Sequence, residues 1–206
     1  LLLGFKENTM HLFRSSLVML VLLTLITGLA YPLFITGLAQ LFFPWQANGS
    51  LVYQDDKLIG SELIGQSFNR ADYFQGRPSM TSEMPYNSMA SGASQLATSN
   101  PLLSEKVAAG VRLWQQRVDN HQVVPVDLVT ASASGLDPHI SLAAAYYQAP
   151  HIALLRQFTI NEIKQLITEN TTSPLIPFLG EPVVNVFKLN QALDRLSAEK
   201  NNKVSG

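Results

Sequence analysis

An uncharged stretch of 40 residues, from Ser15 to Gln54, limits what this chain can fold into more than any other feature. Its centre, Leu17 to Phe43, is 27 residues long and mostly apolar. A helix of that length extends about 40 Å, and the hydrocarbon layer of a bilayer is about 30 Å thick. The stretch therefore predicts one tilted transmembrane helix within residues 15–43, followed by a polar domain over residues 44–206.

The charges that flank this helix indicate its direction across the membrane. Lys6 and Arg14 precede it together with one acid, Glu7, whereas Asp55 and Asp56 are the first charges after it. Because basic flanks stay in the cytoplasm, residues 1–14 are predicted to form a short cytoplasmic N-terminus. The large polar domain is then predicted to be periplasmic, in a single-pass protein of the bacterial inner membrane whose helix contacts lipid.

Two alternatives concern the start of the chain. Gly28-Leu29-Ala30 resembles a signal-peptide cleavage site, but the apolar run continues from Tyr31 to Phe43. Signal cores have only about 7–15 residues, so retention of the helix is the favoured interpretation. The chain begins Leu-Leu-Leu-Gly, and Met10 is therefore an alternative native start, with residues 1–9 lying upstream of it.

A short repeat inside the helix indicates contacts with other helices. Ile-Thr-Gly-Leu-Ala occurs at residues 26–30 and again at 35–39. Small residues let helices approach closely in lipid, and an offset of nine residues places Gly28 and Gly37 on roughly opposite sides. Pro32 removes one backbone donor and predicts a kink. Gly28, Pro32 and Gly37 are candidate interface residues, although small residues are common in membrane helices generally.

Composition and motifs exclude several classes of function. With 14 Lys and Arg against 15 Asp and Glu, the chain lacks the basic footprint of a nucleic-acid-binding protein. It has no cysteine, and His11, His121 and His151 are scattered, so no metal site is expected. Phosphate-loop, H-E-x-x-H and Asp-Lys-Thr-Gly motifs do not occur. We therefore expect no catalytic residues and no ATP hydrolysis by this chain alone.

The first part of the polar domain combines a predicted strand region with a long loop. Residues 51–68 should contain one or two strands, and residues 69–100, rich in Ser, Gly, Asn and Pro, should form a loop. Loops of this length in compact domains are usually functional or disordered, and the aromatic residues and Arg77 here argue against disorder. Asn100-Pro101 predicts the start of a helix that runs to about Asp119.

The second part alternates between helices and strands. Ser141 is expected to cap a short helix through Tyr147, with Pro150 starting or interrupting the next. Thr159 opens a capping-box helix to about Glu169. Residues 183–189 are predicted to be a strand, and Asn190 to cap a final helix through Leu196. The predicted fold class is therefore α/β (α+β), following one transmembrane helix.

The densest polar segment, residues 132–141, reads Ser-Ala-Ser-Gly-Leu-Asp-Pro-His-Ile-Ser. Asp137 and His139 could form a charge-assisted pair, and the small residues could turn backbone N–H groups toward an anion. The alternative, which spacing alone favours, is a tight loop in which Asp-Pro and Gly only set the turn. Ser132 and Ser134 lack the flanking glycines of a nucleophile elbow.

Six motifs in chain order resemble one known family. They are Leu-Thr-Leu-Ile-Thr-Gly-Leu-Ala-Tyr-Pro at 23–32, Phe-Pro-Trp-Gln-Ala-Asn-Gly-Ser at 43–50, Tyr-Phe-Gln-Gly-Arg-Pro-Ser at 73–79, Ala-Ser-Gly-Ala-Ser at 90–94, the segment 128–141 around Asp137, and Leu-Gly-Glu-Pro-Val-Val-Asn-Val at 179–186. The chain resembles KdpC, the C subunit of bacterial Kdp potassium-transporting ATPases, from about Met10 to Leu196.

The resemblance implies a non-catalytic accessory subunit of a high-affinity, ATP-driven potassium importer. Such a subunit stabilises the assembly and lies near the outer K⁺ entrance of the conducting subunit. The implied partners are a channel-like K⁺-conducting subunit, a P-type ATPase catalytic subunit and a small one-helix subunit. K⁺ is then the transported ion, and this chain requires no cofactor of its own.

The family is also described as ATP-binding through a Ser-Gly-rich segment. Here that segment corresponds to Ser132, Ser134 and Gly135, together with Gln148. The predicted periplasmic location conflicts with this role, so ATP binding, here or through the complex, is kept only as an alternative. We instead expect Arg77, Asp137 and His139 to support the shape or docking of the external domain. The rival classes are a membrane-anchored periplasmic hydrolase that uses Asp137, His139 and a serine, and an adaptor without a transport role.

Overall fold

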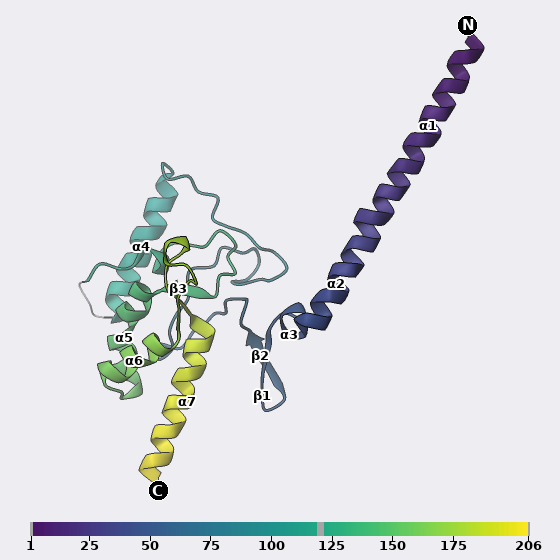
Figure 1. Ribbon diagram of the computed structural model, residues 1–206. Coiled ribbons are helices and arrows are strands. Elements are labelled where there is room, and N and C mark those ends of the chain that lie inside the picture. The colour runs from purple at the N-terminus through teal and green to yellow at the C-terminus, as the bar shows by residue number, and fades with distance from the viewer. Residues whose placement is uncertain (1, 119–121, 206) are drawn as a thin grey trace. The chain divides into compact units, whose positions relative to one another are not determined.

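The chain folds into two units in the computed structural model, which describes residues 2–118 and 122–205 (Figure 1). The first unit ends at Leu51 and the second begins at Val52. The second unit combines helices with two small sheets, so the predicted α+β domain after one N-terminal apolar helix is confirmed. Asp119, the predicted end of a helix, and His121 lie outside the described residues.

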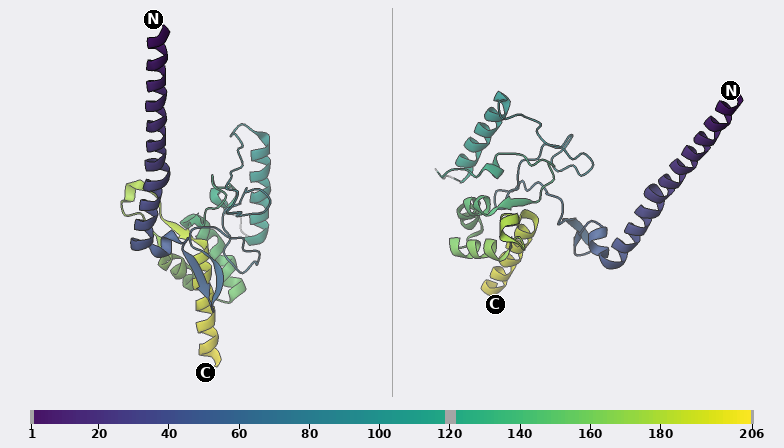
Figure 2. Two further views of the ribbon diagram at one scale, coloured as in Figure 1. Left: turned by 90° about the vertical axis from the view of Figure 1, so that its right-hand side faces the viewer. Right: turned by 45° about the horizontal axis from the view of Figure 1, so that its top comes forward.

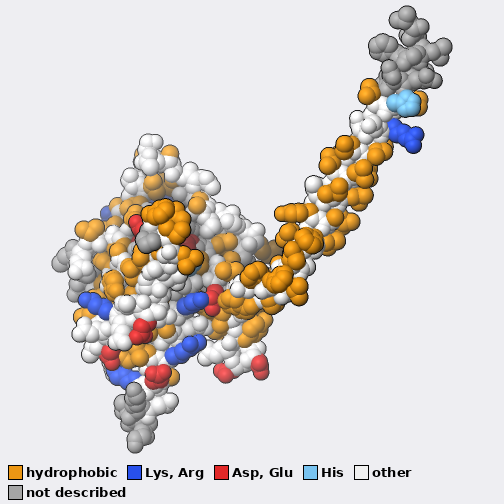
Figure 3. Space-filling view, viewed as in Figure 1, with side chains coloured by type: hydrophobic (Ala, Val, Ile, Leu, Met, Phe, Trp, Pro, Cys, Tyr) orange, Lys and Arg blue, Asp and Glu red, His pale blue; other side chains and the backbone are white. Residues whose placement is uncertain are grey.

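The first unit is a long helix built by the uncharged stretch. It consists of α1 (Leu2–Leu25), the turn η1 (Ile26–Ala30) and α2 (Tyr31–Phe42), and the short α3 (Pro44–Ala47) follows. Met10–Phe42 forms a span of 33 residues, and its most apolar window of 18 residues has a mean hydropathy of 2.3 and no buried residue. Hydrophobic side chains cover the visible face of this span in Figure 3. Among the described residues it is the one helix long and apolar enough to cross a membrane.

The helix contains a π-helical turn directly before Pro32. In η1 the N–H of Tyr31 donates to the carbonyl of Ile26, five residues earlier, and Thr27 Oγ1 donates to Leu23 O at 2.7 Å. Pro32 has no N–H, so one carbonyl of the preceding turn loses its helical donor. Widening that turn is one way in which a helix accommodates such a defect. The sequence predicts a kink here but not the π-helical turn.

The second unit opens with a hairpin and a long loop. β1 (Leu51–Gln54) pairs with β2 (Lys57–Ser61). Asp55 and Asp56 connect them with φ angles of 49° and 59°, the left-handed pattern of a tight hairpin turn. Residues 62–100 then form a trace without helix or strand (Figures 1 and 2), so the predicted loop is confirmed.

Three very short strands form the second sheet. β3 (His139–Ser141), β5 (Val183–Asn185) and β4 (Thr171–Thr172) lie in that order, and both pairings are antiparallel. Ile140 lies opposite Val184 in the register, and both side chains are buried. The sequence does not predict β3 or β4, because two or three residues are too few to show an alternating pattern.

Local capping signals predict two of the helices well. α4 (Pro101–Val118) begins as predicted, and the side chain of Asn100 accepts a hydrogen bond from its first turn. α6 (Ile160–Glu169) carries the predicted capping box, in which the side chains of Thr159 and Glu162 bond each other's main chain. Both helices therefore begin where a side chain satisfies free N–H groups.

The predicted break near Pro150 is wrong. α5 (Leu142–Arg156) begins at the predicted cap Ser141, but it continues through Pro150 to Arg156 instead of ending near Tyr147. Pro150 removes one helical hydrogen bond. The burial of apolar residues on both sides of it offsets that loss. These residues are Ala144, Ala145, Ala149, Ile152 and Ala153.

The predicted boundary near Asn190 is also wrong. β5 ends at Asn185 instead of continuing to residue 189, and α7 (Val186–Ser205) begins directly after it. Asn185 is the capping residue, because its Oδ1 accepts a hydrogen bond from Lys188 N at 3.1 Å. Asn190 lies inside the helix, where its buried side chain has another role described below.

One apolar core joins these elements. It packs β3 and β5 against the inner faces of α4 to α7. Trp114 of α4 takes part through an edge-on contact with Tyr147 of α5, with ring centroids 6.3 Å apart. Phe74, fully buried, brings the long loop into the same core. The loop is therefore a packed part of the domain.

Candidate functional site

Asp137 is the centre of a charged cluster that joins two distant segments. Its Oδ1 accepts a hydrogen bond from His139 N at 3.0 Å and lies 3.4 Å from His139 Nδ1. Its Oδ2 lies 3.4 Å from Nη1 of Arg77, which comes from the long loop. The structure thus forms the predicted Asp137–His139 pair and adds Arg77 to it.

Hydrogen bonds and charge control the ionisation of this cluster. Burial alone raises the pKa of Asp137, but the hydrogen bonds from His139 and the charges of His139 and Arg77 outweigh it, so the pKa lies below its usual value. Burial, assisted by the nearby Asp137 carboxylate, raises the pKa of Tyr86 to about 12. Asp137 is therefore a carboxylate and Tyr86 a neutral phenol at neutral pH.

The serine-rich turn uses its own hydroxyl groups to satisfy its backbone. Gly135 N donates to Ser132 Oγ at 2.9 Å, and Leu136 N donates to Ser134 Oγ at 3.1 Å. Gly135 has a φ of 67°, which favours glycine. The N–H groups of Gly135 and Leu136 are therefore already donating within the turn and do not face an anion site.

The long loop wraps around this turn. Ser79 Oγ donates to Gly135 O at 2.7 Å, and Gly92 N donates to Ser134 O at 2.9 Å. Tyr86 Oη donates to Arg77 O at 2.6 Å and so fixes the main chain at the charged cluster. Sequence reasoning did not identify Ser79 or Tyr86, and only their place in a loop with unusual aromatic content could have indicated them.

A surface pocket of about 470 Å³ opens beside the cluster. Asp127, from η2 (Val126–Leu128), lies in its wall and accepts hydrogen bonds from Ser141 N at 2.7 Å and Ser141 Oγ at 3.2 Å. No pattern in the sequence predicts this buried carboxylate. The polar lining consists of Arg77, Asp127, Asp137, His139, Ser141 and Glu181.

Gln148 binds the long loop and does not join the serine turn in any contact the structure shows for it. Its Oε1 accepts from Gln75 N at 2.8 Å, and its Nε2 donates to Gln75 O at 3.1 Å and to Ala144 O at 3.3 Å. The side chain is only 2% exposed. Of the four residues proposed for nucleotide, Ser132, Ser134 and Gly135 therefore share one turn, and Gln148 is engaged with another segment.

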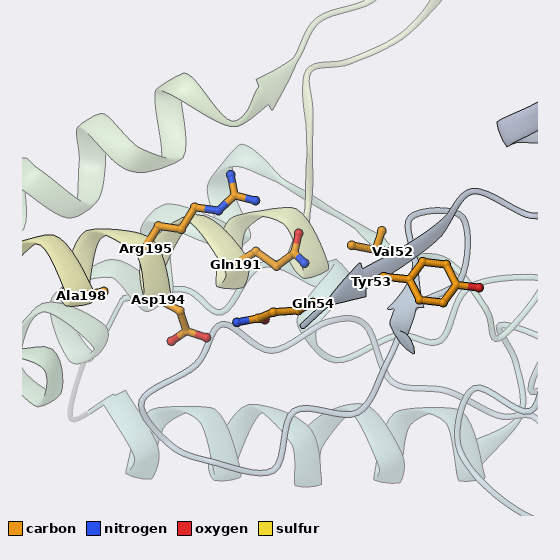
Figure 4. Close-up of a pocket in the computed structure, with 7 residues that line it drawn as sticks. All are labelled: Val52, Tyr53, Gln54, Gln191, Asp194, Arg195 and Ala198. Carbon is orange, nitrogen blue, oxygen red and sulfur yellow. The ribbon is translucent and has the colours of Figure 1, made fainter. Parts of the chain in front are cut away.

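A second pocket, of about 310 Å³, lies between β1 and α7 (Figure 4). Figure 4 shows Gln54 of the hairpin extending toward Asp194 of α7. Asp194 is already paired, since it accepts from Tyr73 Oη at 2.8 Å and lies 3.0 Å from Arg156 Nη2. Arg156 also contacts Asp72 at 3.0 Å, so these charges hold the start of the long loop against α5 and α7.

The candidate interface residues of the membrane helix lie in the first unit. Gly28 is in the π-helical turn, and Pro32 and Gly37 are in α2. A Cβ on Gly28 would meet only Thr24 Cγ2, at 3.9 Å, and a Cβ on Gly37 would meet nothing within 4 Å. Both glycines therefore leave open space beside the helix.

Comparison with known proteins identifies the family. The family model KdpC, described as K⁺-transporting ATPase, c chain, matches residues 13–195. The chain belongs to the KdpC family. The matched region spans both structural units and contains all the candidate residues, and the resemblance seen in the sequence is thus confirmed.

Individual relatives of the family are similar over nearly their whole length. The potassium-transporting ATPase KdpC subunit of Photorhabdus laumondii is 58% identical over 190 residues, which cover 91% of this chain and 97% of the relative. The KdpC subunit of Yersinia enterocolitica is 59% identical over 192 residues, 93% of this chain and 96% of the relative. That of Yersinia pestis is 56% identical over 193 residues, with 93% and 96% covered.

Proposed function

We propose that this chain is a membrane-anchored accessory subunit of an ATP-driven potassium importer, and that it stabilises the complex and lies near the outer K⁺ entrance of the conducting subunit. The observation that carries the proposal is the family match, which covers the apolar helix and the external domain together. The partners are a channel-like conducting subunit, a P-type catalytic subunit and a small one-helix subunit. K⁺ is the transported ion.

The geometry around Asp137 supports a structural role for the polar segment. Asp137 is held by Arg77 and His139, and Ser132 and Ser134 accept hydrogen bonds from the backbone. Groups engaged in this way shape a loop. A hydrolase would instead need a serine within hydrogen-bond reach of a free base. The cluster therefore favours a docking domain over a periplasmic hydrolase.

The charge asymmetry of the helix flanks supports a topology for the subunit. Lys6 and Arg14 precede the span, and Asp55 and Asp56 follow it. By the positive-inside rule, the N-terminus is cytoplasmic and the domain is periplasmic, in the inner membrane. A reporter fused after Gly206 should be active only outside the cytoplasm. Activity on the cytoplasmic side, or cleavage after Ala30, would overturn this topology.

The periplasmic topology and the hydrogen bonds of the candidate nucleotide residues both support a subunit that binds no nucleotide of its own. Gln148 is buried and bonded to Gln75, and the N–H groups of Gly135 and Leu136 donate within their turn. Calorimetry with the full chain in detergent should then show no tight ATP binding. A micromolar affinity that is abolished by Ser134→Ala or Gln148→Ala would restore the nucleotide role and reverse the topology.

Co-purification tests the proposed function directly. The tagged full chain, expressed with the genes beside its own, should recover the conducting, catalytic and one-helix subunits in mild detergent. The recovered complex should hydrolyse ATP in response to K⁺. Recovery of none of these subunits by the wild-type chain would contradict the proposal and favour an adaptor without a transport role.

A further inference from the structure

A short segment of the external domain exposes a group of large apolar side chains. Leu175 is fully exposed, and Phe178, Leu179 and Ile176 are 84%, 69% and 44% exposed. We call residues 174–179 the apolar tip. It includes η3 (Pro177–Leu179), and hydrophobic side chains gather there on the face shown in Figure 3. Single exposed apolar residues are ordinary, but a contiguous group of them marks an interaction site.

The apolar tip is held by regular structure at its base. It connects β4 to β5, which pair through Thr171 with Val184 and Thr172 with Val183. Within it, Leu179 N donates to Ile176 O at 3.0 Å. The strands at its two ends, β4 and β5, are thus paired with each other in the sheet. A loop fixed in this way loses little conformational entropy when its side chains bind a partner.

A charged pocket adjoins the base of the tip. Glu181, Pro182 and Val183, which follow the tip in the chain, line the same pocket of about 470 Å³ as Arg77 and Asp137. Val126 on the pocket wall is 70% exposed and extends the apolar surface. The surface therefore combines an apolar projection with a neighbouring rim of mixed charge.

The charges favour a protein over a lipid surface as the occupant. Residues 171–180 carry no charge, and the nearest charged residues in the chain are the acids Glu169 and Glu181. Loops that enter a membrane surface are usually accompanied by Lys or Arg, which anionic lipids attract. The Glu181 carboxylate, two residues after the tip in the chain, would instead be repelled by lipid phosphates and attracted by a basic side chain of a protein.

We infer that the apolar tip docks into an apolar groove on another subunit of the transport complex, with a basic side chain of that subunit beside Glu181. This inference rests on the proposed function, since it takes its partner from the same complex. Leu175 and Phe178 fill the groove. The Asp137 cluster holds Arg77 and His139 in place on the wall of the pocket beside the tip.

Crosslinking identifies the occupant. A photoreactive phenylalanine analogue replaces Phe178 in the full chain, co-expressed with the pump subunits in membranes, and a matched chain carries it at Leu154, which is 76% exposed on α5. The expected result is a crosslink from position 178 to one other subunit and none from position 154. A crosslink to phospholipid, a crosslink to a second copy of this chain, or no difference between the positions would overturn the inference.

Matched variants measure the contribution of the tip. Leu175→Ser with Phe178→Ser should weaken recovery of the partner about tenfold or more, and Leu154→Ser should leave it unchanged. Because both tip residues are exposed, thermal unfolding of the double variant should match that of the wild type. Glu181→Lys should weaken recovery further than Glu181→Gln, because it adds repulsion of a basic group.

The outcomes separate this inference from the proposed function. If the wild-type chain recovers the pump subunits and the tip variants recover them equally well, the docking inference is wrong and the proposed function stands. If the wild-type chain recovers no pump subunit, both are wrong. Loss of recovery in the tip variants with normal folding supports both.

Discussion

Gln148 and Gln75 are joined by two hydrogen bonds, from Gln75 N to Gln148 Oε1 at 2.8 Å and from Gln148 Nε2 to Gln75 O at 3.1 Å. Asn190 forms the same pair of bonds with the preceding residue, Phe74, at 2.9 Å each. Two buried amides, one from α5 and one from α7, therefore hold consecutive residues of the long loop as a neighbouring strand would.

The first prediction concerns this double clamp. Gln148→Leu keeps the size of the side chain but leaves the main chain of Gln75 without its partners, and it should lower the free energy of unfolding by about 1–3 kcal/mol. Urea unfolding of the full chain in detergent micelles, followed by tryptophan fluorescence, measures the change. Gln165→Leu, on the exposed face of α6, is the control and should change stability by less than about 0.5 kcal/mol. If both variants change the free energy of unfolding equally, the bonds between Gln148 and Gln75 do not contribute to stability.

The second prediction concerns the serine turn. Gly135 has a φ of 67°, and a Cβ there would lie 2.6 Å from Gly92 O and 2.8 Å from Thr81 Cγ2. Gly135→Ala should therefore destabilise the domain by about 2 kcal/mol or more, through strain and overlap together. Gly92→Ala is the matched control, because its nearest contact would be an ordinary 3.8 Å. A Gly135→Ala protein as stable as the control would contradict the close packing of the two loops.

The third prediction concerns pH. The pKa of Asp137 is lowered in the folded state, so its carboxylate stabilises the fold above the unfolded value of 3.8, and this contribution disappears as the pH falls through the lower folded value. Asp137→Asn should thus reduce stability at pH 7, and the difference from the wild type should shrink below about pH 4. Urea midpoints at pH 7, 5 and 3 measure this. Glu105→Gln, on an exposed position of α4, serves as control, and a difference that stays constant with pH would refute the prediction.

The fourth prediction concerns assembly in the membrane. Gly28→Leu with Gly37→Leu is compatible with the isolated helix, because a Cβ at either position meets no atom closer than 3.9 Å. If neighbouring helices pack on these faces, the double variant should lower co-purification of the pump subunits several-fold through lost close contact. Leu29→Phe with Leu38→Phe is the control for added bulk beside each glycine. Wild-type recovery of the double glycine variant would mean that the repeat faces lipid.

Features defined by neighbours in the chain could be predicted, and those defined by distant partners could not. The apolar helix, the start of α4 at Asn100 and the capping box at Thr159 depend on a few adjacent residues, and each was predicted correctly. At the C-terminus, two asparagines each follow apolar residues. Whether Asn185 or Asn190 caps α7 depends on Phe74, which Asn190 binds across 116 residues. A local sequence pattern cannot predict a contact with so distant a residue.

The candidate site shows the same division. Asp137 and His139 are two residues apart, so their pairing was open to inference from spacing. Arg77 lies 60 residues before Asp137, and Ser79 lies 56 residues before Gly135, so neither contact had a local signal. The composition of the loop argued against disorder, but the residues that it contacts required the three-dimensional structure.

The clamp by Asn190 also sets an order of events when the chain is made. Synthesis delivers the loop first, and the N–H of Phe74 gains its partner in Asn190 only after 116 further residues have been made. At about 5–20 residues per second, making those residues takes roughly 6–23 s. During this time Phe74 lacks the buried amide that holds its main chain in the folded domain. This part of the core can therefore close only after α7 has been made.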